Sequence, residues 1–146
     1  MRCYPTGFDD IIGNSSARIA QTATALQGAL ARSDAAAASA LFTPDAVYED
    51  MALHAQILGR LAIARYLNRA LGRVPYGKGS TMVHVVGSDQ GGGYEWRPDA
   101  AFPMRRGIIA LALDEQGQIM HFTTAYDSSL FDDPTYQALV LLAAEQ

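Results

Sequence analysis

Hydrophobic positions in the first third of the chain recur with the period of an α-helix. Four of them are separated by four, three and four residues and therefore share one helical face: Ile19, Ala23, Leu26 and Leu30. Ser33 and Asp34 interrupt this pattern, and either can cap a following helix. That second helix is predicted over the alanine-rich residues 35–41, because alanine has the highest intrinsic helix propensity.

A further amphipathic pattern follows a short extended segment. Pro44 and Asp45 end the alanine-rich helix and lead into an extended stretch at residues 46–51. Gly59 then precedes a third helix, which is predicted to end near Gly72. Its buried face is marked by Ile63, Leu67 and Leu71.

The second half of the chain changes to the alternation that is typical of strands. Strands are predicted at residues 81–86, 93–97, 106–113 and 118–126. Residues 114–117 (DEQG) form a hairpin signal, and Pro134 marks the start of a last helix. The order of helices followed by strands predicts an α+β fold, with helices packed on one face of a curved, mainly antiparallel sheet.

Composition limits the partners that this chain is expected to have. The length of 146 residues predicts one domain over residues 1–146. Disorder is excluded, because 49% of the residues are apolar and only 18% are charged. The net charge of −4 and the lack of a basic run argue against nucleic acid, and the lack of ~20 consecutive apolar residues argues against a membrane span. The lone Cys3 cannot form an internal disulfide, and Asp9 and Asp10 do not fit a signal peptide. We therefore expect a cytoplasmic protein.

Metal and cofactor sites are not expected either. His54, His84 and His121 are widely separated and form no ligand pair at metal-binding spacing. The glycines at residues 91–93 precede a strand, so they lack the helix N-terminus that binds phosphate in nucleotide sites.

Three short motifs in order resemble the nuclear transport factor 2-like superfamily, which includes ketosteroid isomerases, SnoaL-like cyclases, limonene epoxide hydrolase and scytalone dehydratase. The motifs are residues 41–50 (LFTPDAVYED), residues 59–67 (GRLAIARYL) and, near the end, residues 117–119 (GQI) with 124–127 (TAYD). The resemblance covers residues 15–130. It implies a cystatin-like cone, in which N-terminal helices pack on a strongly curved mixed or antiparallel sheet. It also implies a homodimer and a pocket for a hydrophobic small molecule.

The resemblance makes Asp50 the candidate general base. In the first motif, Asp50 stands where ketosteroid isomerases have the aspartate that removes a carbon-bound proton. The oxyanion donors of those enzymes are replaced by Leu26 and by Ile108 or Ile109. We therefore expect Arg106 or His84 to stabilise an oxyanion in their place.

Tyr48 is the third candidate catalytic residue, because alternation on a strand places it on the same face as Asp50. Tyr48 and Asp50 also resemble the water-holding pair of limonene epoxide hydrolase. Trp96 and Thr124 replace the arginine and the last aspartate of that enzyme's catalytic set. The expected substrate-binding residues are Tyr66, His84, Tyr94, Trp96, Ile108, Phe122, Thr124 and Tyr126.

Structural roles compete with each of these assignments. Asp50 can instead accept backbone N–H groups of the next loop. Asp127 is the alternative to Thr124 for the last aspartate of the limonene epoxide hydrolase set, and it can instead cap a turn. His84 among valines can be a core histidine, Tyr66 can be packing, and only one of Arg105 and Arg106 can face inward.

Three functions are therefore compatible with the sequence. The first is a cofactor-free isomerase, cyclase, dehydratase or hydrolase. The second is a protein that binds a hydrophobic ligand without turnover, and the third is a dimeric interaction module. For a dimer, apolar residues on the outer sheet face would form the contact, with Val83, Val85 and Ile109 as candidates.

Overall fold

The structure is a computed structural model that describes the backbone of residues 4–145 and the side chains of residues 18–145. Cys3 lies outside the described residues. The helices are α1 (Tyr4–Ala31), α2 (Ala35–Ser39), α3 (Arg60–Ala70), the short 3-10 helix η1 (Ser128–Leu130) and α4 (Asp133–Ala144). The strands are β1 (Phe42–Asp50), β2 (Ala55–Leu58), β3 (Thr81–Ser88), β4 (Gly91–Arg97), β5 (Gly107–Leu113) and β6 (Ile119–Ala125).

Helix boundaries follow the capping residues of the sequence. The carboxylate of Asp34 accepts the N–H of Ala37 at 3.0 Å and begins α2. Asp132 does the same for Thr135 at 2.8 Å and begins α4. Gly59, with φ of 90°, begins α3 without a side-chain cap. The predicted helix starts at these positions are confirmed.

The strands form one mixed six-stranded sheet in the order β2-β1-β6-β5-β4-β3. Only β1 and β6 run parallel, and the other neighbours are antiparallel. Edge strand β2 was not predicted, because its four residues are too few to show a period. The register between β1 and β6 shifts between Phe42 and Val47, where Pro44 cannot donate to the ladder.

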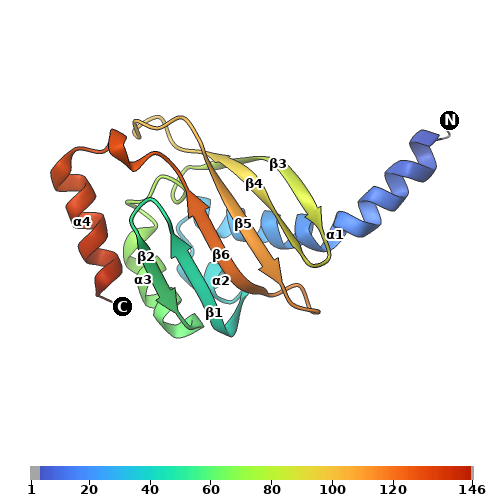
Figure 1. The fold of residues 1–146 in the computed structure, drawn as a ribbon, viewed down its shortest axis with the longest axis horizontal. Coiled ribbons are helices and arrows are strands. Elements are labelled where there is room, and N and C mark those ends of the chain that lie inside the picture. The colour runs from blue at the N-terminus through green and yellow to red at the C-terminus, as the bar shows by residue number, and fades with distance from the viewer. Residues whose placement is uncertain (1–3, 146) are drawn as a thin grey trace.

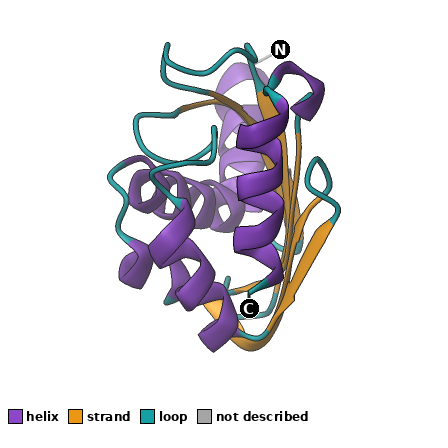
Figure 2. Ribbon diagram, turned by 90° about the vertical axis from the view of Figure 1, so that its left-hand side faces the viewer, coloured by secondary structure: helices purple, strands orange, loops and turns teal. Residues whose placement is uncertain are grey.

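The helices α1, α2 and α3 lie on one side of the sheet, as Figures 1 and 2 show. We call the helix-covered side the inner face and the opposite side the outer face. The four apolar positions predicted for α1 are fully buried against the sheet, as are Ile63 and Leu67 of α3. The predicted α+β architecture is therefore confirmed. No helix among residues 4–145 is long and apolar enough to cross a bilayer.

The predicted inward face of β5 is wrong by one residue. Gly107 packs under Trp96, and a Cβ at Gly107 would lie only 2.1 Å from Cζ2 of that indole. Because only glycine fits there, Gly107 and Ile109 face inward, and Arg106 and Ile108 face outward. The side chain of Arg106 is 71% exposed, and Ile108 is 58% exposed. Arg106 and Ile108 therefore do not line the interior. Ile109 faces inward, so it cannot form the predicted dimer contact on the outer face.

The predicted interior position of His84 is also wrong. The β3–β4 register shifts between Val83 and Val86, and His84 sits in this bulge with φ of 59°. The bulge leaves His84 exposed. It also turns Val85 toward the core, while Val86 is 66% exposed.

Candidate functional site

Asp50 is a buried carboxylate at the end of β1. Its residue is only 1% exposed. The register with parallel strand β6 pairs Asp50 with Thr124, and Tyr48 with Phe122 two residues earlier. Strand alternation therefore directs Tyr48 and Asp50 into the same interior, as predicted.

Tyrosine hydroxyls and backbone N–H groups hold the two oxygens of Asp50. Oδ2 accepts the hydroxyl of Tyr126 at 2.9 Å and the hydroxyl of Tyr76 at 3.0 Å. Oδ1 accepts the backbone N–H of Leu53 at 3.1 Å. The predicted backbone interaction is thus present, and it coexists with two phenol donors on the other oxygen.

The hydroxyl of Tyr76 extends this network to Tyr48. Their oxygens lie 2.7 Å apart, and because Tyr76 donates to Asp50, Tyr48 donates to Tyr76. The buried Tyr66 hydroxyl lies close enough to Tyr76 to affect the ionisation of both phenols, but the geometry of their contact is too poor for a full hydrogen bond. The result is a directed chain from Tyr48 through Tyr76 to Asp50.

Aromatic rings fill the space around this chain. Tyr48 stacks on Phe122, with centroids 4.2 Å apart and planes 9° apart, and it meets the edge of Tyr66 at 5.6 Å. Tyr126 contacts Trp96 edge-on at 5.6 Å. The interior therefore has the predicted aromatic composition, and its rings pack against one another.

Burial changes the acidity of Asp50. Desolvation raises its pKa from 3.8 to about 6, against the opposing effect of the hydrogen bonds from Tyr126, Leu53 and Tyr76. Desolvation also raises the pKa of Tyr76 and Tyr126 far above the ordinary value of 10.0. At neutral pH both phenols are therefore protonated hydrogen-bond donors, while Asp50 is mostly ionised.

Tyr76 is the central residue that sequence reasoning missed. It lies in the loop between α3 and β3, where Val74, Pro75, Tyr76 and Gly77 are all buried. The signal in the sequence is an apolar Val-Pro-Tyr group inside a stretch rich in glycine and basic residues, which indicates a loop anchored in the core. Gly77 is required there, because a Cβ would lie 2.2 Å from the carbonyl oxygen of Leu71.

A second buried network holds this loop in place. Tyr94 donates to Oε1 of Gln27 at 2.8 Å, and Nε2 of Gln27 donates to Ser80 at 2.6 Å. Ser80 in turn donates to the carbonyl oxygen of Gly77 at 2.7 Å. Tyr94 is therefore buried as predicted, but its hydroxyl positions the Tyr76 loop and does not contact Asp50.

The structure gathers seven of the predicted site residues in the interior: Tyr48, Asp50, Tyr66, Trp96, Phe122, Thr124 and Tyr126. Thr124 accepts the indole N–H of Trp96 at 3.2 Å and donates to the carbonyl of Ile108 at 3.0 Å, so it orients the indole. Asp127 caps the turn that begins η1 and takes no part in the interior.

A surface pocket of about 350 Å³ borders the buried carboxylate. It is lined by Glu49, Asp50, Met51, His54, Ala55 and Gln56. Tyr126 and its ring neighbour Phe131, 6.3 Å away, are only partly buried. Among residues 18–145, no three His, Cys, Asp or Glu side chains are grouped closely enough to hold a metal ion.

Comparison with solved structures identifies the fold. No family model and no curated protein sequence match this chain. A steroid delta-isomerase from Pseudomonas aeruginosa shares 21% identity, with a TM-score of 0.64 over 88% of this chain and 90% of that one. An NTF-2 like protein of unknown function from Burkholderia xenovorans LB400 shares 22% identity, with a TM-score of 0.62 over 86% and 94%.

A third similar structure carries a ligand. It is a hypothetical protein with a ketosteroid isomerase-like fold from Catenulispora acidiphila, in complex with trimethylamine. It shares 19% identity, with a TM-score of 0.61 over 86% of this chain and 95% of that one. At these identities the comparisons establish the fold, and the chain has the nuclear transport factor 2-like, cystatin-like α+β cone fold.

Proposed function

We propose that this chain is a cofactor-independent enzyme that moves a proton on a small hydrophobic molecule, with Asp50 as the general base. The observation that carries the proposal is the setting of Asp50. It is a buried carboxylate with a pKa near 6, and two tyrosine hydroxyls hold it among aromatic rings. A base with a pKa close to neutral is both ionised and able to return its proton.

The proposed chemistry is proton transfer next to a carbonyl group. Asp50 removes a proton from the carbon beside the carbonyl, and the bonding electrons of that C–H bond move onto the carbonyl oxygen as an enolate. Tyr76 or Tyr126 then donates a hydrogen bond to this oxygen, in place of the predicted Arg106 and His84. The protonated Asp50 returns the proton to the substrate carbon skeleton, so no other reactant is consumed.

Substrate entry requires a rearrangement at Tyr126 in this proposal. Tyr48, Tyr66, Trp96 and Phe122 are at most 1% exposed, so the interior is filled with side chains. Tyr126 is the donor to Asp50 that is only partly buried. Displacement of its ring exposes one carboxylate oxygen toward the substrate.

Hydrogen–deuterium exchange of enolisable ketones in D₂O, followed by proton NMR, tests the assignment. We expect Asp50→Asn to slow enzyme-catalysed exchange by roughly 10²–10⁴-fold, the usual contribution of a positioned base. Asp127→Asn is the matched control, because Asp127 is exposed and only caps η1. Equal exchange rates in the two variants would remove Asp50 from the mechanism.

The same interior favours a second candidate, namely binding of a small organic ammonium ion without turnover. Tyrosine and tryptophan rings around a carboxylate supply both cation–π attraction and a counter-charge. Trp96 is the only tryptophan of the chain, so its fluorescence reports on the interior. Saturable quenching by trimethylamine, lost in Asp50→Asn, would support this candidate. Ketone exchange that depends on Asp50 would favour the enzyme.

We also propose that the protein is a cytoplasmic homodimer that joins through the outer face of the sheet. The exposed apolar residues Val86 and Ile108 support this surface, together with the exposed Ala110 on β5. An interaction module in which this face is the functional surface is the remaining alternative.

A further inference from the structure

A cluster of arginines lines a pocket on the outer face of the sheet, away from Asp50. The pocket has a volume of about 380 Å³, and Arg97, Arg105 and Arg106 line it. Arg97 ends β4, while Arg105 and Arg106 immediately precede β5. This volume lies within the range of small-molecule sites.

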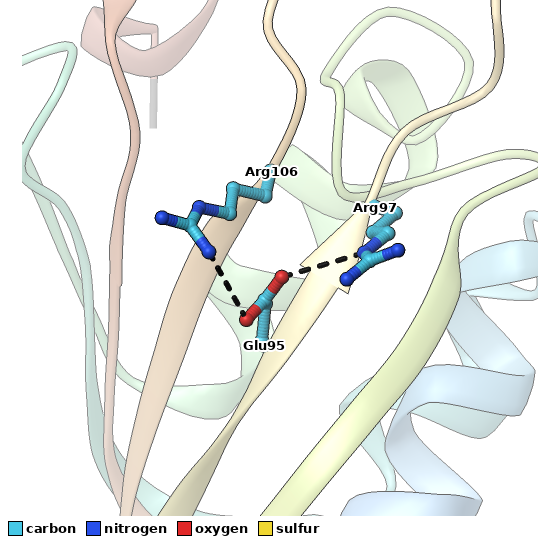
Figure 3. Close-up of polar contacts among 3 residues, drawn as sticks. All are labelled: Glu95, Arg97 and Arg106. Atoms are coloured by element: carbon cyan, nitrogen blue, oxygen red, sulfur yellow. Dashed lines mark hydrogen bonds and ion pairs between the residues drawn. The ribbon is translucent and has the colours of Figure 1, made fainter.

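The β4–β5 register brings the arginines together. Trp96 pairs with Gly107 in this antiparallel pair, so Arg97, which follows Trp96, and Arg106, which precedes Gly107, lie opposite one another at the same end of the two strands. Glu95 lies between them in Figure 3, with Oε2 at 3.4 Å from Nε of Arg97 and Oε1 at 3.8 Å from Nη1 of Arg106. The inward orientation of Gly107 under Trp96 fixes this arrangement.

One carboxylate does not neutralise the cluster. Three guanidinium groups and Glu95 leave an excess of two positive charges, 3 − 1, in a chain whose net charge is −4. Within residues 18–145, Arg105 forms no ion pair and no side-chain hydrogen bond. Asp99, in the adjoining loop, accepts the N–H of Ala101 and does not reach the arginines.

We propose that this pocket binds the phosphate group of a small solute. Guanidinium groups present paired N–H donors whose geometry matches phosphate oxygens, and a phosphate dianion matches the excess charge. The site is independent of the proposed proton transfer, because it lies on the other face of the sheet. Inorganic phosphate and a phosphate monoester share this chemistry, and the pocket volume favours the monoester.

The test uses the full chain and the Nε–Hε signals of its arginines in nitrogen-15 NMR. Sodium phosphate and, separately, phenyl phosphate are titrated at pH 7 with ionic strength held constant by sodium chloride. The signals of Arg97, Arg105 and Arg106 are expected to shift along one saturable curve. Tighter binding of phenyl phosphate identifies a phosphate monoester site, and equal or weaker binding identifies a site for free phosphate.

Substitutions give the result that decides the proposal. Arg105→Gln is expected to weaken phosphate binding roughly tenfold, as loss of a charge-assisted contact requires. Glu95→Gln is expected to tighten it several-fold, because a competing carboxylate is removed. Arg65→Gln, an exposed arginine on α3, is the control and leaves affinity unchanged. Shifts that do not saturate, or equal effects of Arg105→Gln and Arg65→Gln, would overturn the proposal.

Discussion

At the scale of single residues, the acidity of Asp50 results from two opposed effects. Burial disfavours the carboxylate, while the hydroxyls of Tyr76 and Tyr126 and the N–H of Leu53 favour it. Desolvation is the larger effect, so the pKa remains above 3.8. The hydrogen bonds from the tyrosines therefore position Asp50, while its pKa stays high enough for the carboxylate to accept a proton.

The raised pKa of Asp50 predicts a specific dependence of stability on pH. The folded state holds the Asp50 proton up to a pH near 6, whereas the unfolded state releases it near 3.8. Between these values the folded state binds more protons, so the contribution of Asp50 to stability falls as pH rises and is constant above pH 6. A difference of about two pKa units corresponds to about 3 kcal/mol.

Comparison with Asp50→Asn isolates this contribution from the other carboxylates. Urea denaturation at pH 4 and pH 8 is expected to show the variant gaining about 2 kcal/mol relative to wild type between the two values, because the unfolded carboxyl is already partly ionised at pH 4. The variant has no carboxylate at this position, so its interior carries no charge at either pH. A difference between the two proteins that does not change with pH would contradict the raised pKa.

The two central tyrosines predict unequal effects of removing a hydroxyl. Tyr76→Phe removes a donor to Asp50 and the acceptor of the Tyr48 hydroxyl, so it is expected to cost about 1–3 kcal/mol and raise the pKa of Asp50 further. Tyr66→Phe is the matched control, because the buried Tyr66 hydroxyl makes no hydrogen bond of good geometry. Its removal is expected to be neutral or stabilising.

Urea denaturation and carbon-13 NMR titration of the Asp50 carboxylate measure both quantities. Equal losses of stability in Tyr76→Phe and Tyr66→Phe, with an unchanged Asp50 pKa, would show that the hydrogen-bond chain is not what holds this site.

Sequence reasoning at this scale succeeded where strand alternation decides orientation. Tyr48, Asp50, Phe122 and Thr124 lie on regular parts of β1 and β6, so their inward direction follows from a period of two. Tyr76 lies in a loop, where no period exists, and its role depends on hydrogen bonds to residues 26 to 28 positions away. Contacts of that kind depend on the tertiary fold, which alternation does not describe.

At the scale of elements, Gly107 shows why the face of β5 could not be assigned from alternation alone. Both phases of the strand place apolar residues inward, either Ile108 or Ile109. The choice depends on contact between Gly107 and Trp96 across the β4–β5 pair, which the pattern of β5 does not contain. The same choice sets the orientation of Arg106, whose side chain faces outward.

Gly107→Ala is therefore expected to be strongly destabilising. The added methyl would lie 2.1 Å from Trp96, so the indole must move, and overpacking of this kind typically costs about 1–3 kcal/mol. Gly72→Ala is the control, because a methyl group added at Gly72 would meet no atom within 4 Å. Urea denaturation gives both free energies, and Trp96 fluorescence reports the displaced ring. Similar stabilities of the two variants would mean that the indole has room to adapt.

Capping residues made the helices more predictable than the strands. Asp34 and Asp132 each accept the N–H of the third residue after them, and this local bond is encoded within four residues. The bulge at His84 depends instead on how β3 pairs with β4. Local chemistry therefore predicted where helices begin, while pairing between strands decided which side chains reach the interior.

At the scale of the whole molecule, the outer face carries two surfaces of different chemistry. Small and apolar residues cover the middle of the sheet, where Gly93, Ala110 and Thr123 are neighbours on β4, β5 and β6. The arginine pocket lies at the end of β4 and the start of β5. Small residues on this part of the outer face permit close approach of a second sheet, while the charged end remains suited to an anion.

This arrangement predicts a dimer that a single charge can dissociate. Ala110 is exposed at the middle of the outer face, so Ala110→Glu leaves the folded chain intact but would place two buried carboxylates across a symmetric contact. Light scattering after size-exclusion chromatography is expected to give twice the chain mass of 15.7 kDa for wild type and for the control Leu61→Glu, an exposed site on α3. The Ala110→Glu variant is expected to elute at the mass of one chain. A wild-type protein with the mass of one chain would show that the outer face is not a dimer contact and that its apolar residues serve another purpose.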